Sequence, residues 1–479
     1  MTLRQKTING LKWSFVDSFA NQGFQFIIGI ILARLLVPKD FGLIGMLIFF
    51  IAISQSFIDS GFSQALIRKK DCKQVDFNMA FFFNLLVGIV FYLVLFFSAD
   101  LIAGFFGEPQ LFSLIRVLGL VLLINAFGLI QRTILIKEIN FKLQTRISLI
   151  ASFISGTVGI GMALNGFGVW SLVYKTITLQ LTTTFLFWLW NKWKPSVAFS
   201  VQAFKDLFQF GSKLLASGLI DTTYQNIYYL IIGKYFSATN LGYYTRADEF
   251  RKIPSQNLYG IIGRVSYPVL SSIQDKPAKL KSAYKKLIQT TMYITFVLMI
   301  GLATTSEKII LVLIGEQWLP AVIYLQLLCF VGMLYPLHAL NLNMLKVKGR
   351  TDIYLRLEVI KKILAVPTII IGILFGIKIM IVGMIVNSVI AYYLNSYWSG
   401  KLIGYTVREQ IADISLPFFL ATGMGILTFL AGIFIKSGHL VVLISQVAIG
   451  GLIILIFSEL IKLKPYIEIK SIVLKSIRR

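Results

Sequence analysis

The sequence predicts an all-α integral membrane protein of about fourteen transmembrane helices, with two six-helix bundles around a central cavity and a C-terminal helix pair. Three observations lead to this prediction. The 479 residues are 57% hydrophobic and only 14% charged. Apolar runs long enough to cross a bilayer recur along the whole chain. These runs are continuous, which is typical of helices rather than of the alternating strands of a barrel.

The apolar runs place the spans, each near the roughly 20 residues that cross a hydrocarbon core. The first run contains Asp17, Asn21 and Gln25 and lacks a small-residue cleavage site, so we expect it to stay in the protein as a helix. The predicted spans are roughly 13–33, 41–63, 77–98, 111–131, 147–165, 167–189, 211–233, 241–268, 287–306, 319–341, 359–376, 379–397, 414–435 and 440–461.

The basic residues orient the spans. The net charge is +25. If the N-terminus is cytoplasmic, nearly all of this charge falls in the cytoplasmic loops and tails. This bias predicts that both termini are cytoplasmic and that the number of spans is even. Lys70, Lys137 and Lys285 are then cytoplasmic, and Glu108 and Glu316 periplasmic. Because membrane topology explains the charge, we expect no nucleic acid partner.

An internal duplication is predicted from two matches. Residues 27–42 align with 227–242 at an offset of 200, and the tripeptide 106–108 resembles 314–316. Six helices per repeat keep both halves in the same orientation. The predicted domains are therefore 1–200 as an N-terminal bundle, 201–400 as a C-terminal bundle, and 401–479 as an extra helix pair with a basic cytoplasmic tail. Facing bundles suit alternating access.

The eighth span carries a cluster of charges that is too polar to face lipid. Its cations Arg246, Arg251 and Lys252 are candidates for binding an anionic headgroup in the cavity, because arginine offers planar bidentate donors to phosphate oxygens. Two alternatives are an interfacial loop outside the membrane and a structural network in which these cations pair with Asp248 and Glu249.

Polar residues also gather on the first helix of each predicted repeat. The further candidates for the substrate-binding cavity are Tyr224, Gln225, Asn226, Asn21 and Gln25. Hydrogen bonds and ring stacking would suit sugar hydroxyls. Asp17 and Asp221 are the candidate ion-coupling acids, since burial would raise the pKa of a carboxylate toward a range that a proton gradient controls. The alternative for all of them is hydrogen bonding between helices.

Neither catalytic nor metal-ligating patterns occur in the sequence. The histidines, His338 and His439, stand apart from any zinc-like spacing, and the two cysteines are too few for a disulfide framework. No P-loop or dinucleotide fingerprint is present. We therefore predict no catalytic residue, no metal and no cofactor. Small-residue sets predict close helix packing; they are Ser152, Gly156, Gly159 and Gly161, and Gly372 with Gly376.

Several motifs resemble a known family. They are residues 33–42 (ARLLVPKDFG), 57–62 (FIDSGF), 241–247 (LGYYTRA), 267–271 (YPVLS) and 315–318 (GEQW). They resemble the polysaccharide transport branch of the superfamily that also contains multidrug exporters and the lipid-linked peptidoglycan precursor flippase. The greatest likeness is to lipopolysaccharide O-unit or colanic-acid flippases, and it extends over almost the entire chain.

The resemblance implies a flippase of the bacterial inner membrane that moves an oligosaccharide on undecaprenyl diphosphate to the periplasmic leaflet. Its partners would be this lipid-linked oligosaccharide, membrane lipid and, as further candidates, other polysaccharide-assembly membrane proteins; the oligomeric state stays open. One alternative is a cation-coupled exporter of drugs or small molecules. Another is a sugar polymerase or glycosyltransferase, although the intervals between spans are short for an aqueous catalytic domain.

Overall fold

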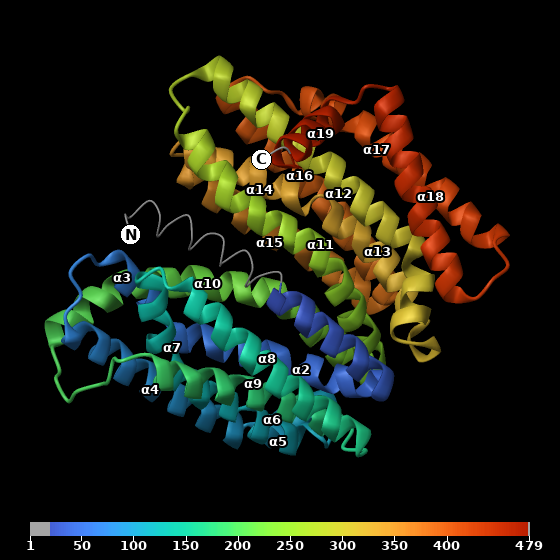
Figure 1. The fold of residues 1–479 in the computed structure, drawn as a ribbon. Coiled ribbons are helices and arrows are strands. Elements are labelled where there is room, and N and C mark those ends of the chain that lie inside the picture. Colours follow the sequence, from blue (N-terminus) through green and yellow to red (C-terminus); the bar gives the residue numbers. More distant parts are fainter. Residues whose placement is uncertain (1–19, 478–479) are drawn as a thin grey trace. The chain divides into compact units, whose positions relative to one another are not determined.

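The computed structural model describes the backbone of residues 20–477, and the side chains of that range except at 256, 257, 259, 261–265, 472, 473 and 475–477. Its packing divides the chain into two compact units, Met1–Gly242 and Tyr243–Arg479. Throughout the described range every regular element is a helix (Figure 1). The predicted all-helical class is confirmed.

The first unit consists of elongated helices joined by short connections. Residues 20–35 are helical, and α2, α4, α7, α8 and α9 run side by side (Figure 1). The elements are α2 (Pro38–Asp59), α3 (Phe62–Arg68), α4 (Gln74–Phe97), α5 (Ala99–Phe106), α6 (Leu111–Leu118), α7 (Leu120–Lys137), α8 (Phe141–Leu164), α9 (Val169–Trp190) and α10 (Val201–Tyr235).

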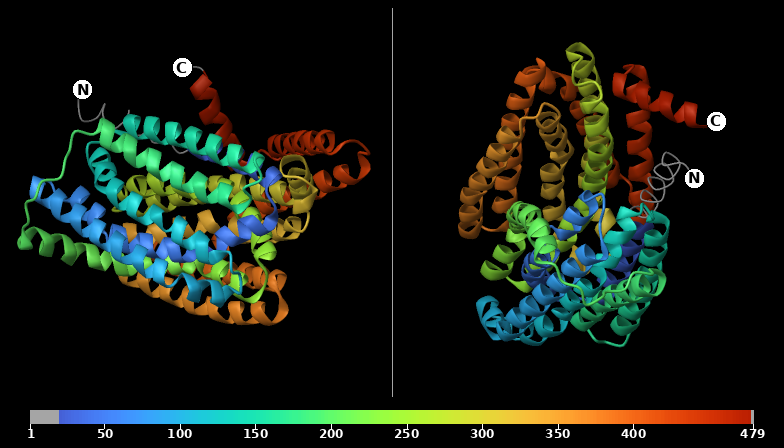
Figure 2. Two further views of the ribbon diagram at one scale, coloured as in Figure 1. Left: turned by 90° about the horizontal axis from the view of Figure 1, so that it is seen from below. Right: turned by 90° about the vertical axis from the view of Figure 1, so that its left-hand side faces the viewer.

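The second unit also consists of elongated helices, of which α12 is the longest, and its last helix, α19, runs across the direction of α18 (Figure 2). The elements are α11 (Ala238–Ser271), whose first turn up to Gly242 belongs to the first unit, α12 (Pro277–Leu313), the short η1 (Glu316–Trp318), α13 (Ala321–Met333), α14 (Tyr335–Val347), α15 (Thr351–Phe375), α16 (Ile377–Ile403), α17 (Val407–Phe434), α18 (His439–Leu460) and α19 (Lys464–Ile477).

Nine helical stretches in the described part of the chain are long and apolar enough to cross a membrane. They are Pro38–Arg68, Gln74–Phe97, Leu111–Lys137, Phe141–Leu164, Pro277–Leu313, Ala321–Val347, Ile377–Ile403, Val407–Phe434 and His439–Leu460.

Helix also covers the described part of the other five predicted spans, which are the stretch 20–35 and α9, α10, α11 and α15. The described part of the stretch 20–35 is shorter than any of these nine helices. The other four helices are more polar, and α10, α11 and α15 carry several charges each. Their spanning role stays a prediction.

Two glycines, at the offset predicted for the duplication, make a close helix crossing within the first unit. A Cβ on Gly42 of α2 would lie 1.6 Å from the carbonyl oxygen of Ala238, and a Cβ on Gly242 of α11 would lie 1.9 Å from that of Pro38. The pairs 42/242 and 38/238 thus exchange roles, which is the reciprocity that two related halves would produce. The division into predicted domains at 200 and 400 stays a prediction.

Some members of the predicted small-residue sets pack closely against a neighbouring helix, and others do not. A Cβ on Gly156 would meet Ile28 of the first helix at 2.4 Å, and one on Gly372 would meet Met380 at 2.4 Å. Gly159 lies against Lys175. The expectation is wrong for Gly161 and Gly376, which have nothing within 4 Å of a Cβ.

Polar contacts with α12 hold α17 and α18, the last two predicted spans, within the second unit. Asp413 of α17 accepts from Gln289 at 3.0 Å and from the Tyr405 hydroxyl at 2.6 Å, and pairs with Lys285 at 2.8 Å. Tyr293 of α12 shares a 2.9 Å hydrogen bond with Ser458 of α18. The helix pair is therefore an integral part of this unit.

Candidate functional site

The charged cluster of α11 forms a compact network of ion pairs. Asp248, whose side chain is 6% exposed, pairs with Arg251 and with Lys252, the latter at 2.7 Å. Arg246 pairs with Glu249 one turn away. Every member lies one helical turn from its partner, which is the spacing at which side chains on a helix meet. Among the described members of this network, three cations face two acids, which leaves one net positive charge.

A glycine on a facing helix of the second unit makes room for this network. Gly332 of α13 lies against the Arg251 side chain, because a Cβ there would meet its Cγ and Cδ at 3.1 Å. Arg251 is 13% exposed and Arg246 17%. Both guanidinium groups are thus largely buried and paired with carboxylates. This is the geometry of the structural alternative, and binding of an anion stays a prediction.

The polar run of α10 is partly engaged with its neighbours. Thr222 shares a 3.0 Å hydrogen bond with Ser56 of α2, and Asn226 donates at 2.8 Å to the Thr222 carbonyl oxygen of its own helix. Asp221 and Tyr224 are half-buried, whereas Gln225 is exposed. The run therefore offers exposed and half-buried polar groups, and its role toward sugars stays a prediction.

The polar stripe of the first helix meets α8. Gln25 donates to the Ser152 hydroxyl at 3.0 Å, and that hydroxyl donates to Asn21 at 2.6 Å. One serine thus joins two of the predicted cavity residues. These contacts match the alternative of inter-helix hydrogen bonding. The third member of the stripe, Asp17, lies outside the described residues.

A cavity that the sequence did not predict lies at one end of the first unit. Its volume is about 660 Å³. It lies between the α3–α4 connection, the end of α7 and the segment after α9. The lining residues are Lys70, Asp71, Cys72, Lys73, Phe77, Ile134, Lys137, Glu138, Asn191, Lys192 and Trp193. The separate basic loops were visible in the sequence, but their meeting in space was not.

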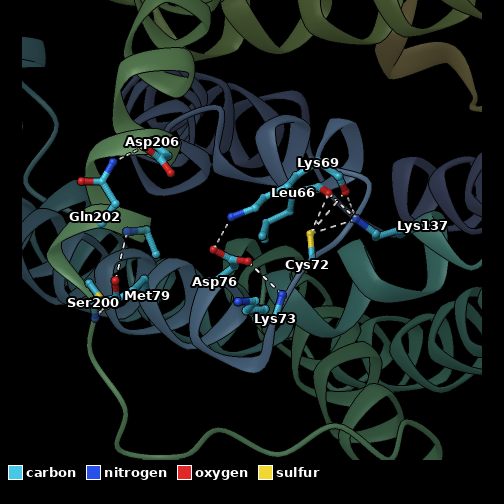
Figure 3. Close-up of polar contacts among 11 residues, drawn as sticks. Leu66, Lys69, Cys72, Lys73, Asp76, Met79, Lys137, Ser200, Gln202 and Asp206 are labelled. Carbon is cyan, nitrogen blue, oxygen red and sulfur yellow. Dashed lines mark hydrogen bonds and ion pairs between the residues drawn. The ribbon is translucent and has the colours of Figure 1, made fainter.

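Lys137 fastens the α3–α4 connection to α7 (Figure 3). Its Nζ donates to the carbonyl oxygen of Leu66 at 2.7 Å, to that of Lys69, and to the Cys72 sulfur at 2.9 Å. A cation suits this place because the last carbonyls of α3 have no partner within their own helix. The three donors of the ammonium group are therefore occupied by the wall of the cavity.

Asp76 fixes the other side of the same connection. It is 1% exposed, accepts from Lys69 Nζ at 2.8 Å, and accepts from the Lys73 backbone N–H at 2.9 Å (Figure 3). The hydrogen bond to Asp76 raises the pKa of Lys69 above its usual value. Asp76 thereby caps α4 and keeps the connection in place.

A buried polar network in the second unit was also missed. His338 of α14 contacts the Ser388 hydroxyl of α16 at 3.1 Å and Asn395 at 3.4 Å. Asn341 accepts from Tyr284 of α12 at 3.0 Å and from Ser399. These groups are isolated in sequence, and only helix packing brings them together. They link α12, α14 and α16.

The fold defines a multi-pass, all-helical membrane protein. The structure is similar to a solved structure described as lipid II flippase MurJ in an inward closed conformation, with a TM-score of 0.76 and 16% identity over 94% of this chain and 98% of that one. It is also similar to an inward-facing multidrug resistance transporter of the MATE family, with a TM-score of 0.63 and 15% identity over 83% and 96% of the two chains.

The chain belongs to the family described as polysaccharide biosynthesis protein, which it matches over residues 31–323. A curated relative, the lipopolysaccharide biosynthesis protein WzxC of Escherichia coli, is 28% identical over 91% of this chain and 90% of its own length. The teichuronic acid biosynthesis protein TuaB of Bacillus subtilis is 25% identical over 91% of both chains. The resemblance inferred from the motifs is confirmed.

Proposed function

We propose that this protein is a flippase that moves an oligosaccharide linked to undecaprenyl diphosphate from the cytoplasmic to the periplasmic leaflet. It serves the synthesis of lipopolysaccharide or of a capsule or exopolysaccharide. The observation that best supports this proposal is the likeness to a lipopolysaccharide biosynthesis protein over about nine tenths of both chains. It is a transporter rather than an enzyme, and it resides in the bacterial inner membrane with both termini in the cytoplasm.

The two units carry polar and charged side chains of the kind that such a substrate would need. The prenyl tail can stay in lipid, whereas the diphosphate and sugars need a polar route. Polar side chains on α10, with Asp221 at half burial, supply hydrogen-bonding groups. The α11 network supplies a net positive charge for an anionic headgroup. Alternating access of the two bundles would carry the headgroup across.

The alternative is export of small organic cations, and its support is the fold likeness to a MATE family transporter. A cation exporter would be served by an excess of acids. The α11 network has three basic and two acidic members, so it favours an anion. The family match also favours the polysaccharide pathway.

The test is transport by the purified full chain in liposomes. A lipid-linked oligosaccharide is placed in the bilayer, and arrival of its sugar at the opposite leaflet is followed with an impermeant glycosidase while sodium and proton gradients are varied. We expect protein-dependent arrival. Movement of organic cations without movement of the glycolipid would favour the exporter, and chemical transfer of the sugar would favour an enzyme.

A further inference from the structure

The cavity in the first unit combines a fixed wall with exposed lysines. Lys137 and Asp76 hold the α3–α4 connection. The opposite wall is held too, because Gln131 donates to the Trp193 carbonyl oxygen at 3.0 Å and the Trp193 indole N–H donates to Gln74 at 3.0 Å. A cavity whose backbone is fixed in this way needs little ordering when a ligand enters.

Three cations of this cavity are exposed and lack an ion-pair partner among the described residues. Lys70, Lys73 and Lys192 are exposed, and the described residues include no ion pair to any of them. With Lys137 they outnumber the two acids of the lining, Asp71 and Glu138, four to two. The cavity therefore has a positive potential that an anion would complement.

We propose that this cavity, here called the lysine pocket, binds the phosphate-bearing headgroup of a lipid at the cytoplasmic face of the membrane. The ligand class is a lipid phosphate ester, either the diphosphate of the transported glycolipid or the headgroup of an anionic phospholipid. The cytoplasmic position rests on the proposed function and its topology. The phosphate would contact Lys70, Lys73 and Lys192, since no ion pair within the described part of the chain involves these ammonium groups.

The position and lining of the pocket favour a lipid over a soluble phosphate. It adjoins the start of α4, the end of α7 and the end of α9, three helix ends on one side of the unit. Phe77, Ile134 and Trp193 supply an apolar and aromatic part of its lining. Aromatic residues of this kind are enriched at the headgroup level of membranes, where lysines also attract anionic lipid. A volume of about 660 Å³ accommodates a headgroup.

Cys72 provides a natural reporter in the pocket. It is half-buried and lines the cavity, whereas Cys329, the other cysteine, is buried. The purified full chain in detergent is treated with N-ethylmaleimide, and modification of the Cys72 peptide is timed by mass spectrometry. The probes are dihexanoyl phosphatidylglycerol, farnesyl diphosphate and, as a neutral lipid, dihexanoyl phosphatidylcholine. We expect the two anionic probes to slow the modification and the neutral probe to leave it unchanged.

Two variants that lose the same charge distinguish binding in the lysine pocket from general electrostatic attraction to a basic protein. The pocket variant is Lys70→Gln/Lys73→Gln/Lys192→Gln. The control variant, Lys194→Gln/Lys205→Gln/Lys213→Gln, removes the same charge from exposed residues that do not line the cavity. Each lysine near a membrane surface contributes about fivefold to binding, so the pocket variant should need roughly 100-fold more anionic probe for half protection. The control should shift this concentration by less than about threefold.

The outcomes are distinct. Stronger protection by farnesyl diphosphate assigns the pocket to the substrate diphosphate, and stronger protection by phosphatidylglycerol assigns it to membrane lipid. Equal protection by phosphatidylcholine, or an equal shift in the control variant, would overturn the proposal. Transport measured on the same preparations keeps the two conclusions apart, because glycolipid transport without protection rejects only the pocket, and protection without transport rejects only the proposed function.

Discussion

The glycine crossing between α2 and α11 allows a quantitative prediction for Gly42→Ala. Real Cβ contacts are essentially never below 3.0 Å, and the new methyl would lie 1.6 Å from the Ala238 carbonyl oxygen. The backbones must therefore separate by more than an ångström, because a carbonyl cannot rotate away as a flexible side chain can. Overpacking costs about 1–3 kcal/mol, with this site at the upper end. Alanine gains about 1 kcal/mol of helix propensity, so the net cost is about 2 kcal/mol.

Thermal unfolding in detergent, followed by tryptophan fluorescence, measures this cost. We expect the apparent Tm of Gly42→Ala to fall by roughly 4–8 °C, using the scaling for a unit of this size. Gly23→Ala is the matched control. Gly23 lies in the helix 20–35 and has nothing within 4 Å of a Cβ, so the same chemical change there should leave the Tm equal or higher.

The reciprocal variant tests whether the two glycines share one crossing. Gly242→Ala should cost about as much as Gly42→Ala, since its methyl would lie 1.9 Å from the Pro38 carbonyl oxygen. In the double variant the helices are already separated by the first methyl, so the second should cost less than it does alone. A Tm for Gly42→Ala equal to that of Gly23→Ala, or simple additivity in the double variant, would refute this account of the crossing.

Three further predictions concern topology and transport. A cysteine at position 285 should react only from the cytoplasmic side and one at 316 only from the periplasmic side; labelling of position 285 from outside would break the predicted span order. If Arg246 binds the diphosphate, Arg246→Lys should lower the initial rate of glycolipid transport about tenfold despite the conserved charge, because the bidentate fork is lost; a rate at the parent level would assign Arg246 to the ion-pair network alone. Asp221→Asn should remove the response of transport to a proton or sodium gradient if this half-buried acid couples the ion; an unchanged response in folded, inserted protein would make Asp221 a structural hydrogen-bonding group.

The α11 network shows how one charge pattern can support both a structural and a functional interpretation. Its acids neutralise most of the charge at a spacing of one helical turn, which lowers the cost of placing arginines in a membrane. Lys252 is the most exposed of the three cations, with 33% of its side chain exposed, and it too is paired, with Asp248. A substrate phosphate would therefore compete for cations that the fold has already paired.

The candidate site could be predicted only in part, because equal residues at repeat-related positions end in different surroundings. Gln25 and Gln225 occupy the same place in the predicted repeats. Gln25 is held by Ser152, whereas Gln225 is exposed. A residue type states which contacts a side chain can make, but the facing helix decides which contact is made. For the same reason, the sequence predicted Lys137 only as a cytoplasmic charge, whereas in the structure its ammonium group binds the carbonyl oxygen of Leu66 and holds the α3–α4 connection.

The sequence by itself determined the properties that depend on the solvent of each segment. Transfer of a helix into lipid depends on the summed polarity of about 20 consecutive residues, so the spans and the helical class can be inferred locally. The tertiary structure decided what depends on neighbours distant in the chain. Lys70 and Lys192 meet around one cavity, and Gly42 and Gly242 meet at one crossing, because helices pack by the shape of whole faces rather than by local composition.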